Sequence, residues 1–330
     1  MIFLTHDPEA LKNYYGDRAL AGLRALDAVK LNPKAAPLTT DELIEAAKGC
    51  DVIVSYRITS GEPALFERAP DLVAFVRCAV DIRNIAVEAA SQAGVLVTQA
   101  SPGFVPAVAE WVVGAMIDLA RGITLGTLRY RAGEPQNAPM GVQLAGATIG
   151  VIGYGRIGQY LCKLARALSM RILVHDPHLA VDAADLTQVD LPTLMRQADF
   201  VICLAVATEA TENLMNAAAF AHMKPSAFFI NASRGNLVDE AALALALDTK
   251  RIAGAALDVG RAPDQMPSPF LACRPDVIAT PHIAGLTPQA IEHQALETVA
   301  QVAEILQGRA PTGAVNTAQA TRLARLRKNA

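Results

Sequence analysis

The chain has 330 residues, which exceeds the usual length of a domain with a single hydrophobic core. This length favours two domains of about 100 to 200 residues each. Hydrophobic residues make up 52% and charged residues 18%, so there is ample apolar surface to bury and extensive disorder is excluded. The formal net charge of -3 lacks the basic excess that a nucleic-acid partner would require.

The amino terminus and the cysteines favour a cytoplasmic protein. No basic region precedes the short apolar start, and Asp7 and Glu9 follow it closely, so we expect no secretory signal. The most apolar long stretch, residues 104–123, contains Pro106 and several charged residues, which a membrane span would not tolerate. The five cysteines lack CxxC spacing, which suits neither a disulfide framework nor a zinc site. We therefore expect no membrane partner and no metal.

Apolar runs of strand length alternate with amphipathic stretches of helix length, which is the pattern of parallel sheets with crossover helices. A helix is expected at residues 40–48, because Asp41 and Glu42 would lie at the positive end of its dipole. Four strands are expected in the first hundred residues, at 2–4, 51–55, 72–77 and 95–99.

The second part of the chain predicts a long helix from about Val105 to Arg129, a Gly- and Pro-bearing loop at 132–141, and a final helix from about Pro288 to Leu306. Six further strands are continuously apolar, which implies burial on both faces, and they span residues 148–152, 170–175, 199–205, 227–231, 252–259 and 277–280. We interpret the tail after Gly308 as a solvated end, with a packing or assembly arm as the alternative; its basic residues are Arg322, Arg325, Arg327 and Lys328.

A glycine-rich turn follows the strand at 148–152. Gly153 permits the tight turn, Gly155 lets the backbone approach a pyrophosphate, and Gly158 lets helix and strand pack closely. Asp176 ends the next strand, where a carboxylate would bind the hydroxyls of the adenine ribose. A carboxylate there repels a 2′-phosphate, so the motif predicts NAD, with NADP the less favoured alternative.

Two further side chains follow the ends of predicted strands, where ligands of parallel sheets collect. Arg234 could bind a carboxylate through its forked guanidinium, although a surface ion pair is an equally simple explanation. His282 could give and take protons near neutral pH, although a lone histidine is more often structural.

These features occur together in six ordered segments, and the chain thereby resembles the D-isomer specific 2-hydroxyacid dehydrogenase family over about residues 50 to 310. The resemblance implies an α/β fold of two doubly wound parallel-sheet domains, with the active site in the cleft. A Rossmann domain, residues 103–285, would be inserted into a discontinuous, flavodoxin-like substrate domain, residues 1–102 and 286–330. The segments are IGVIGYGRIGQ (149–159), HDP (175–177), TEATENLMN (208–216), MKPSAFFINASRGNLVDEAAL (223–243), IAGAALDV (252–259) and ATPHIAGLT (279–287).

The resemblance also implies a reaction and the residues that perform it. The enzyme would be an NAD-dependent oxidoreductase that transfers a hydride between nicotinamide and a small anionic 2-hydroxy or 2-keto acid. Arg234 would anchor the substrate carboxylate, and His282 would act as the acid and base. The implied cofactor contacts are Gly153, Gly155, Arg156, Ile157, Gly158, Asp176, Ala232, Ser233, Arg234, Asp258, His282 and Gly285.

The chain departs from the family beside the histidine. Most relatives place a glutamate five residues after the aspartate that corresponds to Asp258, and that glutamate pairs with the histidine; here the position is Pro263. A carboxylate next to an imidazole fixes its tautomer and favours its charged form. We hypothesise that Asp264, one position later, takes this catalytic role, and the alternative is that His282 acts without a carboxylate partner.

A second departure lies in the loop that would receive the substrate carboxylate. Relatives have glycines near Ala79 and Asp81, so the expected backbone contacts at Ala79 and Val80 are altered, and Asp81 would need a neighbouring arginine to neutralise it. Arg57 follows an earlier strand and could bind a second anionic group of the substrate, although an exposed ion pair would also explain it.

The sequence is also compatible with two other functions. The missing glutamate is compatible with a non-catalytic, NAD-sensing protein similar to transcriptional corepressors of this family. A phosphite- or formate-type dehydrogenase is the other alternative. With about 20 residues after the last helix, we expect no added regulatory domain. The long apolar helix, together with the resemblance to a family of dimers, implies a homodimer.

Overall fold

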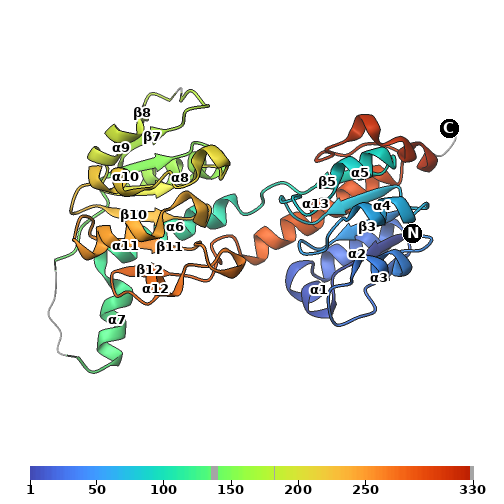
Figure 1. Ribbon diagram of the computed structural model, residues 1–330, viewed down its shortest axis with the longest axis horizontal. Helices are drawn as coiled ribbons and strands as arrows, with labels where there is room; N and C mark the ends of the chain where they lie inside the picture. The colour runs from blue at the N-terminus through green and yellow to red at the C-terminus, as the bar shows by residue number, and fades with distance from the viewer. Residues whose placement is uncertain (135–139, 182, 328–330) are drawn as a thin grey trace. The chain divides into compact units, whose positions relative to one another are not determined.

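The computed structural model describes residues 1–134, 140–181 and 183–327. Pro135 and Pro139 of the predicted loop and Lys328 of the predicted basic tail lie outside this description. The chain forms two compact units: unit 1 comprises Met1–Phe104 and the chain from Thr287 onward, and unit 2 comprises Val105–Leu286 (Figure 1).

Unit 1 contains a parallel five-stranded sheet in the order β2-β1-β3-β4-β5. Its side chains alternate between two cores: Ile2 and Val52 pack with helices on one face, and Phe3 and Ile53 with helices on the other. Its strands are β1 (Ile2–Leu4), β2 (Val29–Leu31), β3 (Val52–Ser55), β4 (Ala74–Arg77) and β5 (Leu96–Gln99). Its helices are α1 (Pro8–Tyr14), α2 (Asp17–Leu26), α3 (Thr40–Ala46), α4 (Pro63–Arg68), α5 (Val87–Gln92), α13 (Pro288–Ile305) and the 3₁₀ turns η4 (Thr317–Gln319) and η5 (Thr321–Leu326).

Unit 2 contains a parallel seven-stranded sheet in the order β12-β11-β10-β9-β6-β7-β8. The chain order reverses beside β6, which has β7 on one side and β9 on the other, and such a switch point is where parallel sheets bind nucleotides. Its strands are β6 (Thr148–Ile152), β7 (Arg171–His175), β8 (Thr187–Gln188), β9 (Phe200–Cys203), β10 (Phe228–Asn231), β11 (Gly254–Leu257) and β12 (Val277–Ala279). Its helices are α6 (Val105–Arg121), α7 (Ile123–Arg131), α8 (Arg156–Ala167), α9 (Leu191–Gln197), α10 (Ala217–His222), α11 (Glu240–Asp248), α12 (Pro269–Ala272) and the 3₁₀ turns η1 (Glu209–Thr211), η2 (Gly235–Leu237) and η3 (Pro263–Gln265).

The prediction of a single long helix from Val105 to Arg129 is wrong. Gly122 adopts a left-handed conformation with φ 61°, which ends α6 and starts α7 at a bend of 62°. Among the described residues no single helix is long and apolar enough to cross a membrane, whereas the bent pair α6 and α7 together reaches that length and composition.

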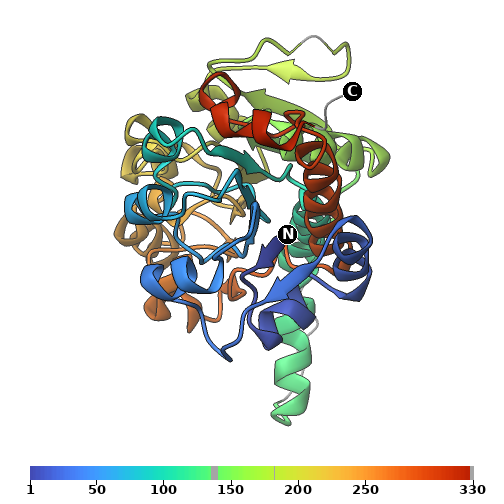
Figure 2. The same cartoon turned by 90° about the vertical axis from the view of Figure 1, so that its right-hand side faces the viewer.

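The interpretation of the tail as a solvated end is also wrong for the residues that the structure describes. The backbone of Gly313 accepts a hydrogen bond from Gln99, and that of Val315 donates to Val97, so the tail runs along the open edge of β5 (Figure 2). Farther along, Leu323 is buried and Nη1 of Arg322 donates to the carbonyls of Ala69 and Leu72, each at 2.8 Å. The tail packs because an edge strand offers unpaired backbone groups that need partners.

Candidate active site

The glycine-rich turn lies between β6 and α8. Gly153 has φ 96°, and a Cβ there would lie 2.7 Å from the carbonyl oxygen of Leu204. A Cβ on Gly158 would lie 2.3 Å from the carbonyl oxygen of Gly153, so neither position accepts a larger residue. A Cβ on Gly155 would meet nothing within 4 Å, and no side chain caps the start of α8 at this residue. The turn therefore offers open space and backbone N–H groups at a helix amino terminus, which suits a pyrophosphate.

Asp176 lies beside this turn, immediately after β7. Its Oδ2 accepts a hydrogen bond from the backbone N–H of Tyr154 at 2.8 Å, and its Oδ1 accepts from His178 and Leu179 at 2.9 and 3.0 Å. Burial acts to raise the pKa of Asp176, but these three N–H groups outweigh burial and hold the pKa below its ordinary value. The carboxylate is ionised and fixed where the adenine ribose of a dinucleotide would need an acceptor, so the residues of this turn fit NAD.

The turn that carries Arg234 follows β10 and is tied to its own backbone. Nδ2 of buried Asn231 donates to the carbonyl of Arg234 at 2.9 Å, and Oγ of Ser233 donates to the carbonyl of Ala205 at 2.6 Å. Nη1 of Arg234 donates to the carbonyl of Ser233 at 2.7 Å. These bonds place the half-buried guanidinium of Arg234 at the carboxyl edge of the sheet.

His282 lies two strands away, on the turn after β12, and Asp258 holds that turn. The carboxylate of Asp258 is 2% exposed; its Oδ1 accepts from Oγ1 of Thr280 at 2.7 Å and from the N–H of Ile283 at 2.8 Å. Its Oδ2 accepts from the N–H of Ala284 at 2.9 Å. Sequence reasoning assigned Asp258 to the cofactor and missed this bracing role, because nothing in the spacing indicates that these groups meet.

The hydrogen bond that the structure gives to the ring of His282 differs from the one we predicted. Nδ1 of His282 lies 3.0 Å from the main-chain oxygen of Asp264, so the partner in this contact is the carbonyl and not the carboxylate. Asp264 and Gln265 both adopt left-handed backbone conformations, with φ 57° and 58°. This conformation turns the carbonyl toward the ring and could not be read from the sequence.

In unit 1, the predicted substrate loop follows β4. Ala79 and Val80 are partly exposed, and Asp81 is paired with Arg83, whose Nη2 lies 2.5 Å from its Oδ2. The neutralising arginine that the sequence required is therefore Arg83. The guanidinium of exposed Arg57 lies 6.0 Å from the centre of the Tyr14 ring.

Sequence reasoning missed the role of Arg77 at the end of β4. Its side chain is fully buried and donates to the carbonyls of Tyr56 and Thr59 and to Oδ1 of Asn84. Burial lowers the pKa of Arg77 to about 10. Arg77 thus holds the loop that carries Arg57, and the available signal was a charged residue at the end of an otherwise apolar strand.

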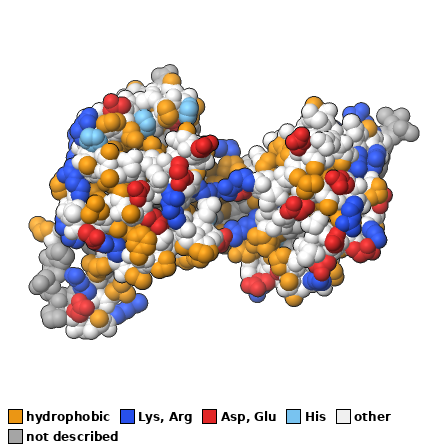
Figure 3. Space-filling view, viewed as in Figure 1, with side chains coloured by type: hydrophobic (Ala, Val, Ile, Leu, Met, Phe, Trp, Pro, Cys, Tyr) orange, Lys and Arg blue, Asp and Glu red, His pale blue; other side chains and the backbone are white. Residues whose placement is uncertain are grey.

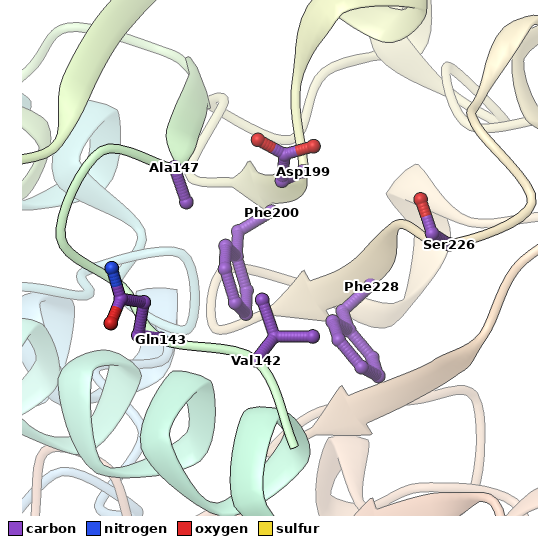
Figure 4. Close-up of a pocket in the computed structure, with 7 residues that line it drawn as sticks. All are labelled: Val142, Gln143, Ala147, Asp199, Phe200, Ser226 and Phe228. Atoms are coloured by element: carbon purple, nitrogen blue, oxygen red, sulfur yellow. The ribbon is translucent and has the colours of Figure 1, made fainter. Parts of the chain in front are cut away.

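A pocket of about 300 Å³ lies at the other edge of the unit 2 sheet (Figure 4). Ala147, Asp199 and Ser226 precede β6, β9 and β10, so the pocket is at the amino ends of the strands, opposite the glycine-rich turn. Its floor is formed by the stacked rings of Phe200 and Phe228. The pocket is therefore separate from the residues predicted to bind NAD.

Comparison with known proteins identifies the family. The model of the NAD binding domain of D-isomer specific 2-hydroxyacid dehydrogenases matches residues 113–284. This chain belongs to that family. It is 36% identical over 273 residues to an (S)-sulfolactate dehydrogenase of Chromohalobacter salexigens, covering 81% of this chain and 88% of the relative. It is 31% identical to a hydroxypyruvate reductase of Thermotoga maritima, covering 80% and 88%.

A D-3-phosphoglycerate dehydrogenase of Methanocaldococcus jannaschii is 34% identical and is covered over 57% of its length, against 89% of this chain. Among solved structures, the TT0316 protein of Thermus thermophilus is 27% identical with a TM-score of 0.83, covering 96% of this chain and 100% of the other. A D-2-hydroxyisocaproate dehydrogenase, at 24% identity and a TM-score of 0.85 over 96% and 99%, shows the same fold.

These findings confirm the predicted fold class, the enzyme class and the cofactor. The protein is an NAD-dependent oxidoreductase of the 2-hydroxyacid dehydrogenase family, built on two parallel α/β sheets. All five cysteines are free, and the described residues include no group of three His, Cys, Asp or Glu side chains that could hold a metal ion.

Proposed function

We propose that this enzyme interconverts a small anionic 2-hydroxy acid and its 2-keto acid, with Arg234 anchoring the carboxylate and His282 as the acid and base. The observation that carries the proposal is the placement of both side chains at the carboxyl edge of the sheet, on turns after β10 and β12, the same edge as the glycine-rich turn. Charge that develops on the substrate oxygen would be stabilised there by a guanidinium and an imidazole.

The chain's residues have separate tasks in this proposal. Bound NAD supplies or accepts the hydride. Asp176 and the amides of Arg156 and Ile157 would bind the dinucleotide, together with the three glycines of the turn. The remaining proposed cofactor contacts are Ala232, Ser233, Asp258 and Gly285.

We further propose that the substrate carries a second anionic group. The names of two relatives, sulfolactate and phosphoglycerate dehydrogenase, denote substrates that have a sulfonate or a phosphate in addition to the carboxylate. In this chain Arg57 would bind that group, while backbone groups at Ala79 and Val80 would receive the carboxylate. Arg57 suits the role because it is exposed, lies near the Tyr14 ring, and belongs to a loop that Arg77 fixes.

The test is NADH oxidation with a panel of keto acids: 3-sulfopyruvate, phosphohydroxypyruvate, hydroxypyruvate, glyoxylate and pyruvate. We expect 3-sulfopyruvate and phosphohydroxypyruvate, which carry a second anionic group, to have the highest kcat/KM. Arg57→Ala should raise KM for these two keto acids about 10- to 100-fold and leave KM for pyruvate within about 2-fold, because a charge-assisted hydrogen bond contributes about 1.5–3 kcal/mol. Arg24→Ala, which removes another charge from unit 1, is the matched control. Absence of turnover with every keto acid, while NADH still binds, would overturn the proposed reaction.

We also propose that the enzyme is a homodimer formed through α7. We further propose that it works in a reducing compartment such as the cytoplasm. Three apolar side chains of α7 are exposed: Ile123 at 53%, Leu128 at 55% and Tyr130 at 73%. Figure 3 shows hydrophobic and basic side chains side by side over this helix. Free cysteines fit a reducing compartment. Sedimentation should show twice the monomer mass for the wild type, and Leu128→Asp with Tyr130→Asp should yield monomers.

A further inference from the structure

The loop between β11 and α12 is built so that a main-chain oxygen faces the ring of His282. Within the loop, the N–H of Gly260 donates to the carbonyl of Gln265 at 2.8 Å, and the N–H of Ala262 donates to that of Met266 at 3.1 Å. The two left-handed residues, Asp264 and Gln265, lie inside this closed loop. Because its own backbone bonds close the loop, the carbonyl of Asp264 keeps its direction toward Nδ1 of His282, 3.0 Å away.

A carbonyl oxygen can only accept a hydrogen bond, so Nδ1 of His282 must carry the proton in this contact. In the neutral ring Nε2 is then the acceptor, and it is the nitrogen available to take a proton from a substrate hydroxyl. A carbonyl fixes the tautomer as a carboxylate does, but it adds no net charge. The backbone of the loop thus orients the ring of His282 as the missing glutamate would, but it does not supply the negative charge of that glutamate.

Arg261 connects this loop to the neighbouring turn. Its Nη2 donates to Oε1 of Glu212 at 2.8 Å and to Oδ1 of Asn213 at 2.6 Å. The same nitrogen donates to the carbonyl of Asn236 at 3.0 Å, and its Nε donates to that of Val238 at 3.1 Å. Asn236 and Val238 lie on the segment that directly follows Arg234, so one guanidinium joins the loop that faces His282 to the segment that follows Arg234.

Three further contacts hold the same two segments together. The backbone N–H of Arg261 donates to Oε1 of Glu240 at 3.0 Å, and the Oε2 of Glu240 accepts from Oγ of Ser268 at 2.5 Å. A Cβ on Gly235 would lie 2.0 Å from the carbonyl oxygen of Gly260, so the two loops touch backbone to backbone. Displacing the Arg261 loop would therefore move the carbonyl that faces His282.

We propose that the main-chain oxygen of Asp264 sets the catalytic tautomer of His282 and that Arg261 is the positioning residue that keeps it in place. The inference rests on the proposed role of His282 as the acid and base. Neither part of it depends on the carboxylate of Asp264.

The tautomer can be observed directly by ¹⁵N NMR of the imidazole rings in the full-length protein. The chain has six histidines, and loss of one spin system in His282→Gln identifies the signal of His282. At alkaline pH we expect the Nδ1–H tautomer in the wild type and in Asp264→Asn, because asparagine tolerates the left-handed conformation. In Asp264→Val, which is β-branched and strained at φ 57°, the signal should shift toward the Nε2–H form. Loss of the Nδ1–H form in Asp264→Asn would show that the carboxylate is the partner and overturn the proposal.

Kinetics test the positioning residue. We expect Arg261→Ala to lower kcat about 10- to 100-fold, with KM and the NADH dissociation constant changed less than about 3-fold and with the Nδ1–H signal weakened. Arg261→Lys lacks the planar fork and should recover only part of kcat. Arg309→Ala, which removes an exposed ion pair with Glu304, is the control. An unchanged kcat and an unchanged ring signal in Arg261→Ala would overturn the positioning role.

The two experiments separate this inference from the proposed reaction. If no keto acid is turned over but the ring signals respond as described, the reaction is wrong and the placement of the tautomer stands. If turnover is present and the ring of His282 carries its proton on Nε2 in the wild type, the inference fails and the reaction stands.

Discussion

At the scale of single residues, buried polar groups decide how the site and the fold respond to substitution. Asp258 gives the clearest case, because its carboxylate accepts one hydroxyl and two backbone hydrogen bonds from the turn of His282. Removing it would leave two backbone N–H groups without the acceptor that now fixes the turn.

We predict that Asp258→Ala lowers the free energy of unfolding by about 2–4 kcal/mol and lowers kcat together with it. Urea unfolding and steady-state kinetics measure both effects. The control is Asp248→Ala, which removes an exposed ion pair with Arg274 in the same unit. This substitution should lower the free energy of unfolding by less than about 1 kcal/mol. Full stability in Asp258→Ala would contradict the bracing role.

Asp176 leads to a prediction about the cofactor. Asp176→Ser should raise the NADH dissociation constant about 10- to 100-fold and narrow the preference for NADH over NADPH, because in the proposed site the carboxylate would bind the ribose hydroxyls and would repel a 2′-phosphate. The pKa of Asp176 in the folded protein is depressed, so its carboxylate is ionised above the ordinary carboxyl range and is protonated only in stronger acid. The carboxylate can therefore contribute to NADH binding at every pH above that range. Fluorescence titration of NADH should therefore give a constant affinity between about pH 5 and 8 as far as Asp176 is concerned.

The buried residue His6 should make the stability of the fold sensitive to acid. Its ring is 1% exposed, neither ring nitrogen has a hydrogen-bond partner among the described residues, and burial lowers its pKa to about 3. The unfolded chain binds a proton at His6 below about pH 6.5 while the folded chain does not, so stability falls as the pH drops toward 3.

Between pH 7 and 5 this single residue should cost about 2 kcal/mol of stability. Urea unfolding at the two pH values is the measurement, with His6→Phe as the variant that removes the titration. An equal loss in wild type and His6→Phe would show that His6 does not drive the acid response.

At the scale of elements, the tail completes the sheet of unit 1. Asn316 is 5% exposed; its Oδ1 accepts from the N–H of Val97 at 2.8 Å, and its Nδ2 donates to the carbonyl of Val95 and to Oγ of Ser91, each at 2.9 Å. The side chain thus pairs with β5 as a neighbouring strand would.

We predict that Asn316→Ala destabilises the protein by about 2–3 kcal/mol and speeds amide exchange at Val97. Hydrogen exchange followed by mass spectrometry of the β5 peptide gives the local readout. Asn213→Ala, in unit 2, should leave that peptide unchanged. Equal exchange in wild type and Asn316→Ala would mean that the tail does not protect the edge.

At the scale of the whole molecule, unit 2 is one continuous stretch of chain with its own cores on both faces of its sheet. We predict that residues 105–286 fold alone and bind NADH within about 10-fold of the affinity of the complete chain. Circular dichroism and NADH fluorescence are the measurements. An unfolded fragment would contradict the independence of its core.

How far the sequence predicts the structure differs between parts of the chain. The continuously apolar runs at β6, β9 and β10 predicted buried parallel strands because burial on both faces leaves no alternation. The edge strands β2 and β8 were missed, since their side chains are partly or fully exposed and leave no such run. The glycine-rich turn and the position of Asp176 beside it could be predicted from spacing, because this turn is local in sequence.

The contacts that could not be predicted are those between segments that lie far apart in the sequence. The meeting of Gly235 with Gly260 and of Arg261 with Glu212 depends on loop conformations that no residue pattern specifies. The fully buried Arg77 also escaped notice, because its partners are main-chain carbonyls.

The carbonyl that faces His282 has a consequence for how this enzyme can change. Every residue type has a main-chain oxygen, so no single codon change deletes this group. Selection at position 264 would act on backbone conformation, admitting the residues that adopt a left-handed φ, and not on the chemistry of the side chain. A search for catalytic side chains would pass over this position, and engineering of His282 in its proposed role as the acid and base would have to be done by remodelling the loop.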